Sequence, residues 1–284
     1  MNLKLRLLLP VLLALPLPAV DRQSRTPYHG ASDSVAKPEA AVLLEAWFSH
    51  SAGLQKAVEH EVVRLDIQRE GAWEKVGEAR TDGEGHAVLA FKVPNTPGPF
   101  PLRWSLGPES CEATLHVLAP GARATVFDID GTLTPSDREV LKDYARRLVR
   151  NPKAEGPKVR RGGVEAAQRA AKQGLVVFLT GRAPWLSRPT REWLKVHGFP
   201  EGLVLLMPET RDILPSENRV GRGKMDRLRD LQRQGLTFTA AFGNAPTDIS
   251  AYEAVGLPKA NTFILGKHGG ERGTVALGDT FPSE

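Results

Sequence analysis

From residue 123 onward the chain alternates between short apolar runs and amphipathic segments. The apolar runs are ATVFDI, LVVFLT, LVLLMP, FTAAFG and NTFILG, and helical patterns such as GGVEAAQRAAKQG and GKMDRLRDLQRQG lie between them. Strands that are buried on both faces are continuously apolar, and strands that alternate with helices form parallel sheets. The sequence therefore predicts an α/β domain over residues 120–284, with a parallel sheet covered by helices on both faces.

Three of these apolar runs end in polar residues. Asp128 and Asp130 close the first run, Thr180 closes the second, and Asn244 comes directly after FTAAFG. Open α/β sheets bind ligands beyond the carboxyl ends of their strands. We therefore expect a functional site at this edge of the sheet, built around these four residues.

Residues 41–119 have a different pattern. Short alternating or β-rich runs are separated by turn signals such as TDGEG and PNTPGP, and this spacing predicts a smaller, immunoglobulin-like β-sandwich. We expect Trp47, Trp73 and Trp104 to fill or edge its core, and the alternative is that one of them stacks on a ligand. Residues 21–40 are polar, contain Pro, Gly and Ser, and have no apolar period, so we predict a linker there.

The first 20 residues have the composition of a signal peptide. Lys4 and Arg6 precede an apolar run that is too short to span a bilayer as a helix but suits the hydrophobic region of a secretory signal. We expect export, to the periplasm or to the periphery of a membrane. The alternatives are an uncleaved N-terminal anchor or a misplaced start codon, and a misplaced start would make the protein cytoplasmic.

The charge is +5, so the position of the basic residues matters more than their number. A basic run over residues 146–161 is either a solvated face or a patch that attracts an anionic membrane surface or a phosphate-bearing substrate. No nucleic-acid recognition motif accompanies it, so we expect no nucleic-acid partner. The basic residues of the run are Arg146, Arg147, Arg150, Lys153, Lys158, Arg160 and Arg161.

Cysteine and histidine usage restricts the chemistry further. Cys111 is the only cysteine and the seven histidines are scattered along the chain. We therefore expect neither an intrachain disulfide nor a zinc site of the usual kinds.

The two acids of the DIDGT segment can divide one reaction between them. Asp128 is placed to attack phosphorus and form an aspartyl-phosphate. Asp130 is placed to protonate the departing alkoxide and later to take a proton from water. Gly131 permits a sharp turn, and Thr132 can fix the loop with a hydrogen bond. For DIDG alone, a turn that merely ends a strand is the alternative, but a hydrophobic run followed by DxDGT is more specific.

An apolar strand followed by DxDGT resembles the signature of the haloacid dehalogenase (HAD) superfamily of phosphohydrolases, and FLTGR, GRGKMDRL and FGNAPTDISAY follow in that family's order. The resemblance implies a Rossmann-like parallel sheet. It also implies that Thr180 binds the phosphoryl group and that Lys224, at a helix start, neutralises the nucleophile and the phosphate. Asn244 and Asp248 then belong to the Mg²⁺-binding loop.

Four segments narrow the resemblance: DIDGTLTPSD, LTGRA, GNAPTDISAYEAVGLP and GFPEGLVLLMPE. They are similar to the C-terminal domain of lipin-type phosphatidate phosphatases and to a related domain of retinal-degeneration-B-type phosphatidylinositol transfer proteins. The second group implies a phosphatidate-binding domain that has lost its nucleophile, whereas the presence of Asp128 favours catalysis. Asn244 stands where the wider superfamily commonly has Asp, and SDREVLKDYARRLV departs from the lipin pattern.

Phosphoryl transfer gathers negative charge around these acids, so the chemistry calls for a cation. Mg²⁺ suits a site made of oxygen ligands. We expect these from the Asp128 carboxylate, the backbone carbonyl of Asp130, and Asn244 or Asp248. Lys224 adds a fixed positive charge on the other side of the phosphoryl group.

The segments between the motifs are short. About 30 residues separate Thr132 from Gly162, which is too few for a full cap domain, and an uncapped site accepts a large or membrane-presented phosphate monoester. We expect Thr132, Gly181 and Arg182 to line the phosphate site, although Arg182 is equally suited to holding the loop. Trp185 can line the site, dip into lipid, or pack in the core.

The sequence thus predicts a Mg²⁺-dependent phosphatase that acts on phosphatidate or a related lipid phosphate. Two alternatives remain. One is a HAD phosphatase for a soluble or protein-borne phosphate, and the other is a non-catalytic phosphatidate-binding module whose working surface is the sandwich.

Overall fold

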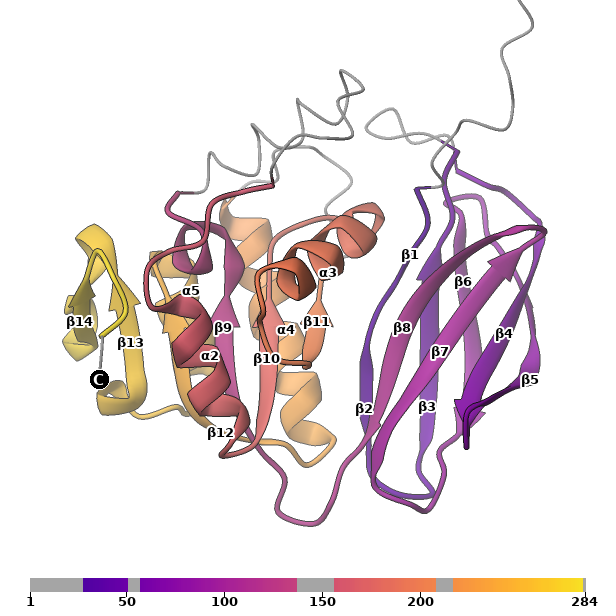
Figure 1. Ribbon diagram of the computed structural model, residues 1–284, viewed down its shortest axis with the longest axis horizontal. Coiled ribbons are helices and arrows are strands. Elements are labelled where there is room, and N and C mark those ends of the chain that lie inside the picture. The colour runs from indigo at the N-terminus through magenta and orange to yellow at the C-terminus, as the bar shows by residue number, and fades with distance from the viewer. Residues whose placement is uncertain (1–27, 51–56, 137–155, 208–216, 283–284) are drawn as a thin grey trace, which may run out of the picture.

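The computed structural model describes residues 28–50, 57–136, 156–207 and 217–282. The predicted signal peptide, residues 21–27 of the predicted linker, the helical pattern at residues 138–149 and residues 146–155 of the basic run lie outside these ranges. Of the helices within them, none combines the length and apolarity needed to cross a membrane. The described residues form two domains, a β-sandwich and an α/β domain (Figure 1).

The sandwich consists of two sheets that share one core. The five-stranded sheet has the order β2-β8-β7-β4-β5 and the three-stranded sheet has the order β1-β3-β6. Strands β3 to β8 lie in residues 41–119, where the sequence predicts short alternating or β-rich strands. The strands are β1 (Gly30–Ala31), β2 (Ser34–Ala36), β3 (Ala41–Trp47), β4 (Val62–Arg69), β5 (Ala72–Arg80), β6 (His86–Lys92), β7 (Gly98–Leu106) and β8 (Glu109–Val117).

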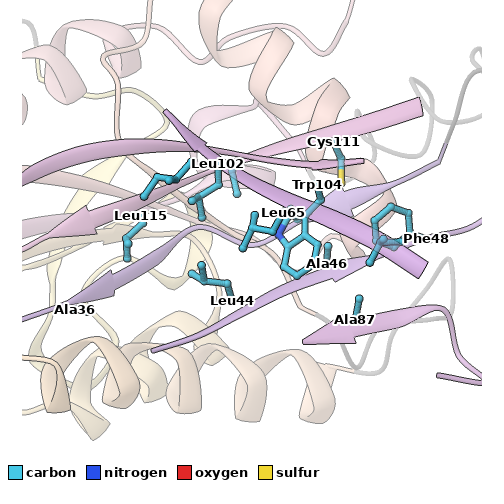
Figure 2. Packing of buried hydrophobic residues seen from close by; sticks show 14 of the residues in the cluster. Ala36, Leu44, Ala46, Phe48, Leu65, Ala87, Leu102, Trp104, Cys111 and Leu115 are labelled. Carbon is cyan, nitrogen blue, oxygen red and sulfur yellow. The ribbon is translucent and has the colours of Figure 1, made fainter. Parts of the chain in front are cut away.

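Alternation along these strands separates core from surface. Leu44 from the small sheet meets Leu65, Trp104 and Leu115 from the large one, and all four are fully buried (Figure 2). Burial of such side chains stabilises the sandwich by about 1.5–3 kcal/mol each. The sandwich therefore has a core of its own. Its assignment to the immunoglobulin type remains a prediction.

Of the three tryptophans expected in or around this core, only Trp104 is fully buried. Trp47 is half-buried and stacks on His86 with ring centroids 4.7 Å apart. Trp73 is half-buried beneath the Arg103 guanidinium, 4.2 Å from the ring centroid. Both lie on the outer faces, because the inward positions of their strands are taken by aliphatic residues.

The linker predicted for residues 21–40 requires correction within its described part. Residues 30–31 form β1, which pairs with β3, and residues 34–36 form β2, which pairs with β8 in parallel. These strands are too short to show an alternating apolar pattern, so the sequence gives no strand signal here. Asp33, between them, is buried.

The α/β domain is built on a six-stranded sheet in the order β11-β10-β9-β12-β13-β14, and all of its strand pairs are parallel. The five predicted strands are confirmed, and the short β14 is an addition. The strands are β9 (Arg123–Asp128), β10 (Leu175–Leu179), β11 (Leu203–Leu205), β12 (Thr237–Gly243), β13 (Thr262–Leu265) and β14 (Val275–Gly278).

Helices cover both faces of this sheet, as predicted. Val126 packs into the cluster that includes residues of α4 and α5, whereas Phe127 packs into the cluster with α2 and α3. This alternation along β9 explains why its run is continuously apolar. The helices are α2 (Gly163–Ala171), α3 (Ser187–Val196), α4 (Glu217–Arg233) and α5 (Pro246–Ala254).

The start of α4 differs from the expectation. The helix begins at Glu217, so Lys224 lies about two turns inside it rather than at its start. Residues 221–223, the sequence GRG just before Lys224, have the composition of a loop. The first of these glycines, Gly221, allows close packing between helices. A Cβ atom on Gly221 would lie only 3.2 Å from Thr247 Cγ2 on α5. The contact with α5 therefore accounts for a glycine within the helix.

Candidate active site

The carboxyl end of β9 lies in the middle of the sheet, between β10 and β12. Asp128 is the last residue of β9, opposite Leu179 of β10, and it is 2% exposed. Thr180 directly follows β10 and Asn244 directly follows β12. Thr180 donates to Asp130, Lys224 pairs with Asp128, and the Asn244 amide lies beside Asp128 and the Asp130 carbonyl, so the structure brings the four predicted residues together.

The loop after Asp128 reverses the chain within a few residues. Gly131 has a φ of +81°, a conformation that favours glycine. Its backbone N–H donates to Thr134 Oγ1 over 2.9 Å. The Thr132 hydroxyl reaches the Asn244 side chain at 2.9 Å. Thr132 therefore fixes the loop, which is one of its predicted roles.

Arg160 holds the same loop from the other side. Its guanidinium donates to the carbonyl oxygens of Gly131 at 2.6 Å, Thr132 at 2.8 Å and Pro135 at 2.9 Å, and also to that of Asp279 at 2.6 Å. This residue belongs to the basic run that we expected to be either a solvated face or an anion-attracting patch. The correction for Arg160 is that its planar fork binds backbone carbonyls of this loop and of Asp279.

Lys224 lies between two buried carboxylates. Its ammonium donates to Asp128 Oδ1 at 2.5 Å and to Asp248 Oδ1 at 2.6 Å. Burial on its own would lower the pKa of Lys224, but the attraction of the two carboxylates outweighs burial and raises it. Burial, reinforced by the Asp248 carboxylate, raises the pKa of Asp128 well above its ordinary range. One ammonium thus serves two carboxylates.

Asp248, in the first turn of α5, is held by backbone N–H groups that precede this helix. Its Oδ2 accepts hydrogen bonds from the backbone N–H groups of Asn244 and Ala245, both at 3.0 Å, which caps the helix. The chain fits only because residue 243 is glycine, since a Cβ atom there would lie 2.5 Å from Asp248 Cβ. Both oxygens of Asp248 therefore already accept hydrogen bonds.

Asp130 has a different environment from Asp128. Arg182 donates to it from Nη2 at 2.7 Å and from Nε at 3.1 and 3.2 Å, and Thr180 Oγ1 donates at 2.7 Å. Arg182 is held in turn by Thr190 Oγ1 on α3, at 2.9 Å from Nη1. Of the two roles considered for Arg182, holding the loop is the one seen here, and the Asp130 side chain remains 19% exposed.

Asn244 brings three oxygen atoms together. One terminal atom of its amide lies 3.1 Å from Asp128 Oδ2, 3.0 Å from the Asp130 carbonyl oxygen and 2.9 Å from Thr132 Oγ1. With nitrogen in this position, the amide donates to all three. With oxygen there, it accepts from Thr132 and faces two further oxygens, a set of hard ligands of the kind that Mg²⁺ prefers.

The residues at the tip of β9 thus fit a divalent cation in donor chemistry. Within the described ranges, no group of three or more His, Cys, Asp or Glu side chains is arranged to hold a metal ion. A cation here would use the Asp128 carboxylate, the Asp130 carbonyl and the Asn244 amide oxygen. Of the two alternatives for the third ligand, Asn244 faces this point, whereas Asp248 faces Lys224 and the backbone N–H groups of Asn244 and Ala245.

Gly181 and Trp185 follow Thr180 on the same connection. A Cβ atom on Gly181 would come within 3.0 Å of Val220 Cγ1, so glycine allows α4 to approach the loop. Trp185 is half-buried and meets Tyr28 edge-on, with ring centroids 6.3 Å apart. Trp185 thus packs against Tyr28 and is not part of the clusters of buried hydrophobic residues that form the cores.

Sequence reasoning did not find Arg160, Thr190 or Asp33 as contributors to this part of the molecule. Arg160 lies in a basic run and Thr190 in an amphipathic helix, so neither has a local signal. Asp33 lies in a polar stretch of ordinary loop composition. The partners of Arg160 and Asp33 are distant in sequence, and Thr190 meets Arg182, eight residues away, only because the chain turns between them.

Comparison with known proteins identifies relatives in two functional groups. The family described as "PITM 1-3, LNS2 domain" matches residues 125–266. Membrane-associated phosphatidylinositol transfer protein 1 of Homo sapiens is 30% identical over 254 residues, covering 85% of this chain and 19% of the relative. Protein retinal degeneration B of Drosophila melanogaster is 27% identical over 252 residues, covering 85% of this chain and 18% of the relative.

The second group consists of phosphatases. Phosphatidate phosphatase LPIN3 of Mus musculus is 28% identical over 180 residues, covering 56% of this chain and 20% of the relative. This chain therefore spans about a fifth of the length of the curated relatives that it matches. Because residues 120–284 alone cannot supply 85% of the chain, the match with the transfer proteins includes part of the sandwich.

Proposed function

The chain belongs to the LNS2 domain family, and from this premise we propose that it is a Mg²⁺-dependent, HAD-type phosphohydrolase that acts through an aspartyl-phosphate. We propose phosphatidate, or a related lipid phosphate monoester, as its substrate. The relatives include both a phosphatidate phosphatase and lipid transfer proteins, so a lipid-related function is common to the group.

One observation carries the proposal. Two carboxylates that are two residues apart have separate environments, since Asp128 is buried against Lys224 and Asp130 lies on the loop in contact with Arg182. A nucleophile and a proton carrier need such a division of labour. Binding alone would need neither.

In the first step, an oxygen of Asp128 attacks the phosphorus atom of the ester. The bond from phosphorus to the ester oxygen breaks, and Asp130, in its protonated form, gives a proton to the departing alkoxide. The alcohol leaves and the phosphoryl group remains on Asp128. Lys224, at 2.5 Å from Asp128 Oδ1, keeps positive charge next to the transferring group.

In the second step, Asp130 takes a proton from a water molecule, which attacks phosphorus. The bond between phosphorus and Asp128 breaks, inorganic phosphate leaves, and the Asp128 carboxylate is restored. Asp130 is protonated again and ready for the next ester. The contact with Arg182 and Thr180 holds Asp130 in place for both proton transfers.

Charge balance supports a bound cation. Asp128 and Asp248 share the single ammonium of Lys224, which leaves one negative charge in excess beside the position of an anionic phosphate. A Mg²⁺ ion held by Asp128, the Asp130 carbonyl and Asn244 would reverse this sign and polarise the phosphoryl oxygens.

The position of the basic run supports a membrane-presented substrate. Lys158 and Arg161 are exposed on either side of Arg160, which contacts residues 131, 132 and 135 of the loop after Asp128, here called the nucleophile loop. We propose that this segment attracts an anionic membrane surface to the site. We also propose that the first 20 residues direct export or anchor the protein to a membrane.

A second candidate function is phosphatidate binding without catalysis. The breadth of the match with transfer proteins, 85% of the chain against 56% for the phosphatase, favours it. The carboxylate at position 128 and its lysine favour the enzyme.

Release of phosphate distinguishes these candidates. The full chain is incubated with phosphatidate vesicles or with p-nitrophenyl phosphate, with Mg²⁺ or with EDTA, beside Asp128→Asn. We expect Mg²⁺-dependent release from phosphatidate that is lost in Asp128→Asn. Vesicle binding without release would support the binding module. Release from p-nitrophenyl phosphate alone would point to a soluble or protein-borne phosphate.

A further inference from the structure

Asp33 connects three separate elements at the junction of the two domains. Its side chain is fully buried and accepts hydrogen bonds from the backbone N–H groups of Thr114 on β8, at 2.6 Å, and Val204 on β11, at 2.7 Å. Arg191 on α3 donates to it from Nη1 at 3.0 Å and from Nη2 at 2.7 Å. One carboxylate thus ties the sandwich to both a strand and a helix of the α/β domain.

The backbone of residues 30–31, next to Asp33, packs against the start of α3. Ser187, the first residue of α3, donates from Oγ to the carbonyl oxygen of Ala31 at 3.3 Å, and Arg191 Nε donates to Ser187 Oγ at 3.2 Å. A Cβ atom on Gly30 would lie 1.9 Å from the Pro184 carbonyl oxygen. The segment around Asp33 therefore fits closely on residues 184–191.

The same helix carries a contact to the proposed acid. Thr190 is adjacent to Arg191 and accepts from Arg182 Nη1 at 2.9 Å. Arg182 holds Asp130 through its other nitrogen atoms. A continuous path of hydrogen bonds and one helix therefore runs from β8 of the sandwich to the Asp130 carboxylate.

The type of contact favours a role in geometry. A buried ion pair is weak evidence for stability, because removing two charges from water costs about as much as their attraction returns, but its bidentate form fixes direction. The sequence match with the transfer proteins also includes part of the sandwich, which is consistent with the two domains acting as one unit.

We propose that Asp33 and Arg191 are positioning residues for the phosphoryl-transfer reaction. The sandwich, through them, sets the position of α3, and α3 aligns Asp130 through Thr190 and Arg182. This inference rests on the proposed function. It gives the sandwich a task in the reaction of the neighbouring domain.

The proposal predicts a loss that depends on the leaving group. An alkoxide must be protonated as it departs, so the first step on phosphatidate needs an aligned Asp130. A p-nitrophenolate ion leaves without a proton, so the first step on p-nitrophenyl phosphate does not. A general loss of folded protein would reduce both rates equally.

The test uses the full chain with Mg²⁺ and measures the first turnover of a short-chain soluble phosphatidate and of p-nitrophenyl phosphate. For Asp33→Asn we expect the first turnover of phosphatidate to fall roughly tenfold or more, a part of the roughly 10²–10⁴-fold that general acid catalysis contributes. The first turnover of p-nitrophenyl phosphate should remain near the wild-type rate. Arg188→Gln is the matched control, because Arg188 is exposed on α3 and pairs with Glu192 on the same helix.

A second pair of variants tests the last link and covers the possibility that Asp33→Asn does not fold. Thr190→Val keeps the shape but removes the acceptor for Arg182, whereas Thr190→Ser keeps the hydroxyl. We expect Thr190→Val to show the leaving-group-dependent loss and Thr190→Ser to restore the wild-type ratio of the two rates.

Two results would overturn the inference, and they differ from each other. Wild-type protein without phosphatase activity on either ester removes the proposed function and this inference together. Active wild-type protein, with an unchanged ratio of the two rates in both Asp33→Asn and Thr190→Val, removes the positioning role alone.

Discussion

Asp33 at the domain junction and Asp128 at the tip of β9 are both buried carboxylates, but they are neutralised to different extents. Asp33 has Arg191 to itself and accepts two further backbone N–H groups. Asp128 shares Lys224 with Asp248. The junction is balanced in charge, whereas the strand tip carries one negative charge in excess.

This difference in charge compensation distinguishes a carboxylate that fixes the geometry of the fold from one that is able to react. A buried charge with a full set of partners fixes geometry at little net energy. A buried group that lacks compensating charge has a perturbed pKa and is ready to bind a cation or to react. The excess at the strand tip, added to burial, distinguishes Asp128 from Asp33 and supports the proposed role of Asp128 as the nucleophile.

The largest expected effect comes from removing the positively charged side chain beside each carboxylate, Lys224 beside Asp128 and Arg191 beside Asp33. Lys224→Met leaves two buried carboxylates together, and we expect a loss of about 3–5 kcal/mol in the free energy of unfolding. Arg191→Met leaves one carboxylate that still accepts two N–H groups, so its loss should be smaller. Urea unfolding of both variants measures the difference, with Lys172→Met, at an exposed site, as the control. Equal losses would remove the distinction between the two centres.

Arg160→Lys tests a guanidinium group that donates to four backbone carbonyls. A lysine cannot reproduce a fork that reaches four carbonyl oxygens, so the nucleophile loop should shift. We expect kcat to fall about 100-fold with a small change in KM, the size of effect that a misplacement of about 1 Å produces. Arg161→Lys, next to it and exposed, should retain wild-type kcat, and a loss of equal size in both variants would mean that the effect does not come from the carbonyl contacts of Arg160.

Asn244→Asp increases the excess of negative charge at the strand tip. The added carboxylate strengthens an oxygen site for a divalent cation, so we expect half-maximal activity at a Mg²⁺ concentration roughly tenfold lower. Titration of phosphate release with Mg²⁺ measures this shift. An unchanged Mg²⁺ dependence would place the ion away from Asn244.

Asp128→Asn removes the excess negative charge at the strand tip, and its effect on the free energy of unfolding should depend on pH. Burial and the Asp248 carboxylate raise the pKa of Asp128, so the ionised carboxylate destabilises the folded state. This penalty is present above the raised pKa and disappears as pH falls through it. We expect Asp128→Asn to raise the free energy of unfolding by about 1 kcal/mol near neutral pH.

Urea titrations of wild type and Asp128→Asn in EDTA, between about pH 8 and about pH 5, test this prediction. The advantage of Asp128→Asn over wild type should shrink as the pH is lowered. An advantage that grows toward low pH would have the opposite sign and would show that folding lowers the pKa of Asp128.

Local patterns in the sequence determined most of the architecture. The continuous apolar run of β9 and the helical periodicity around it predict a covered parallel sheet, and alternation in residues 41–119 predicts the sandwich strands. The acids of DIDGT could be placed at a strand end because a strand, a turn and their side chains are adjacent in the chain. These features depend on short-range periodicity, which a sequence displays directly.

The tertiary structure alone decided which charges are paired. Asp33 accepts from Val204, 171 residues away, and Arg160 reaches Asp279, 119 residues away. No local period records such contacts, and a polar stretch or a basic run has the same composition whether its side chains face water or the interior. The sequence shows where a carboxylate stands, and the folded chain determines how completely its charge is neutralised.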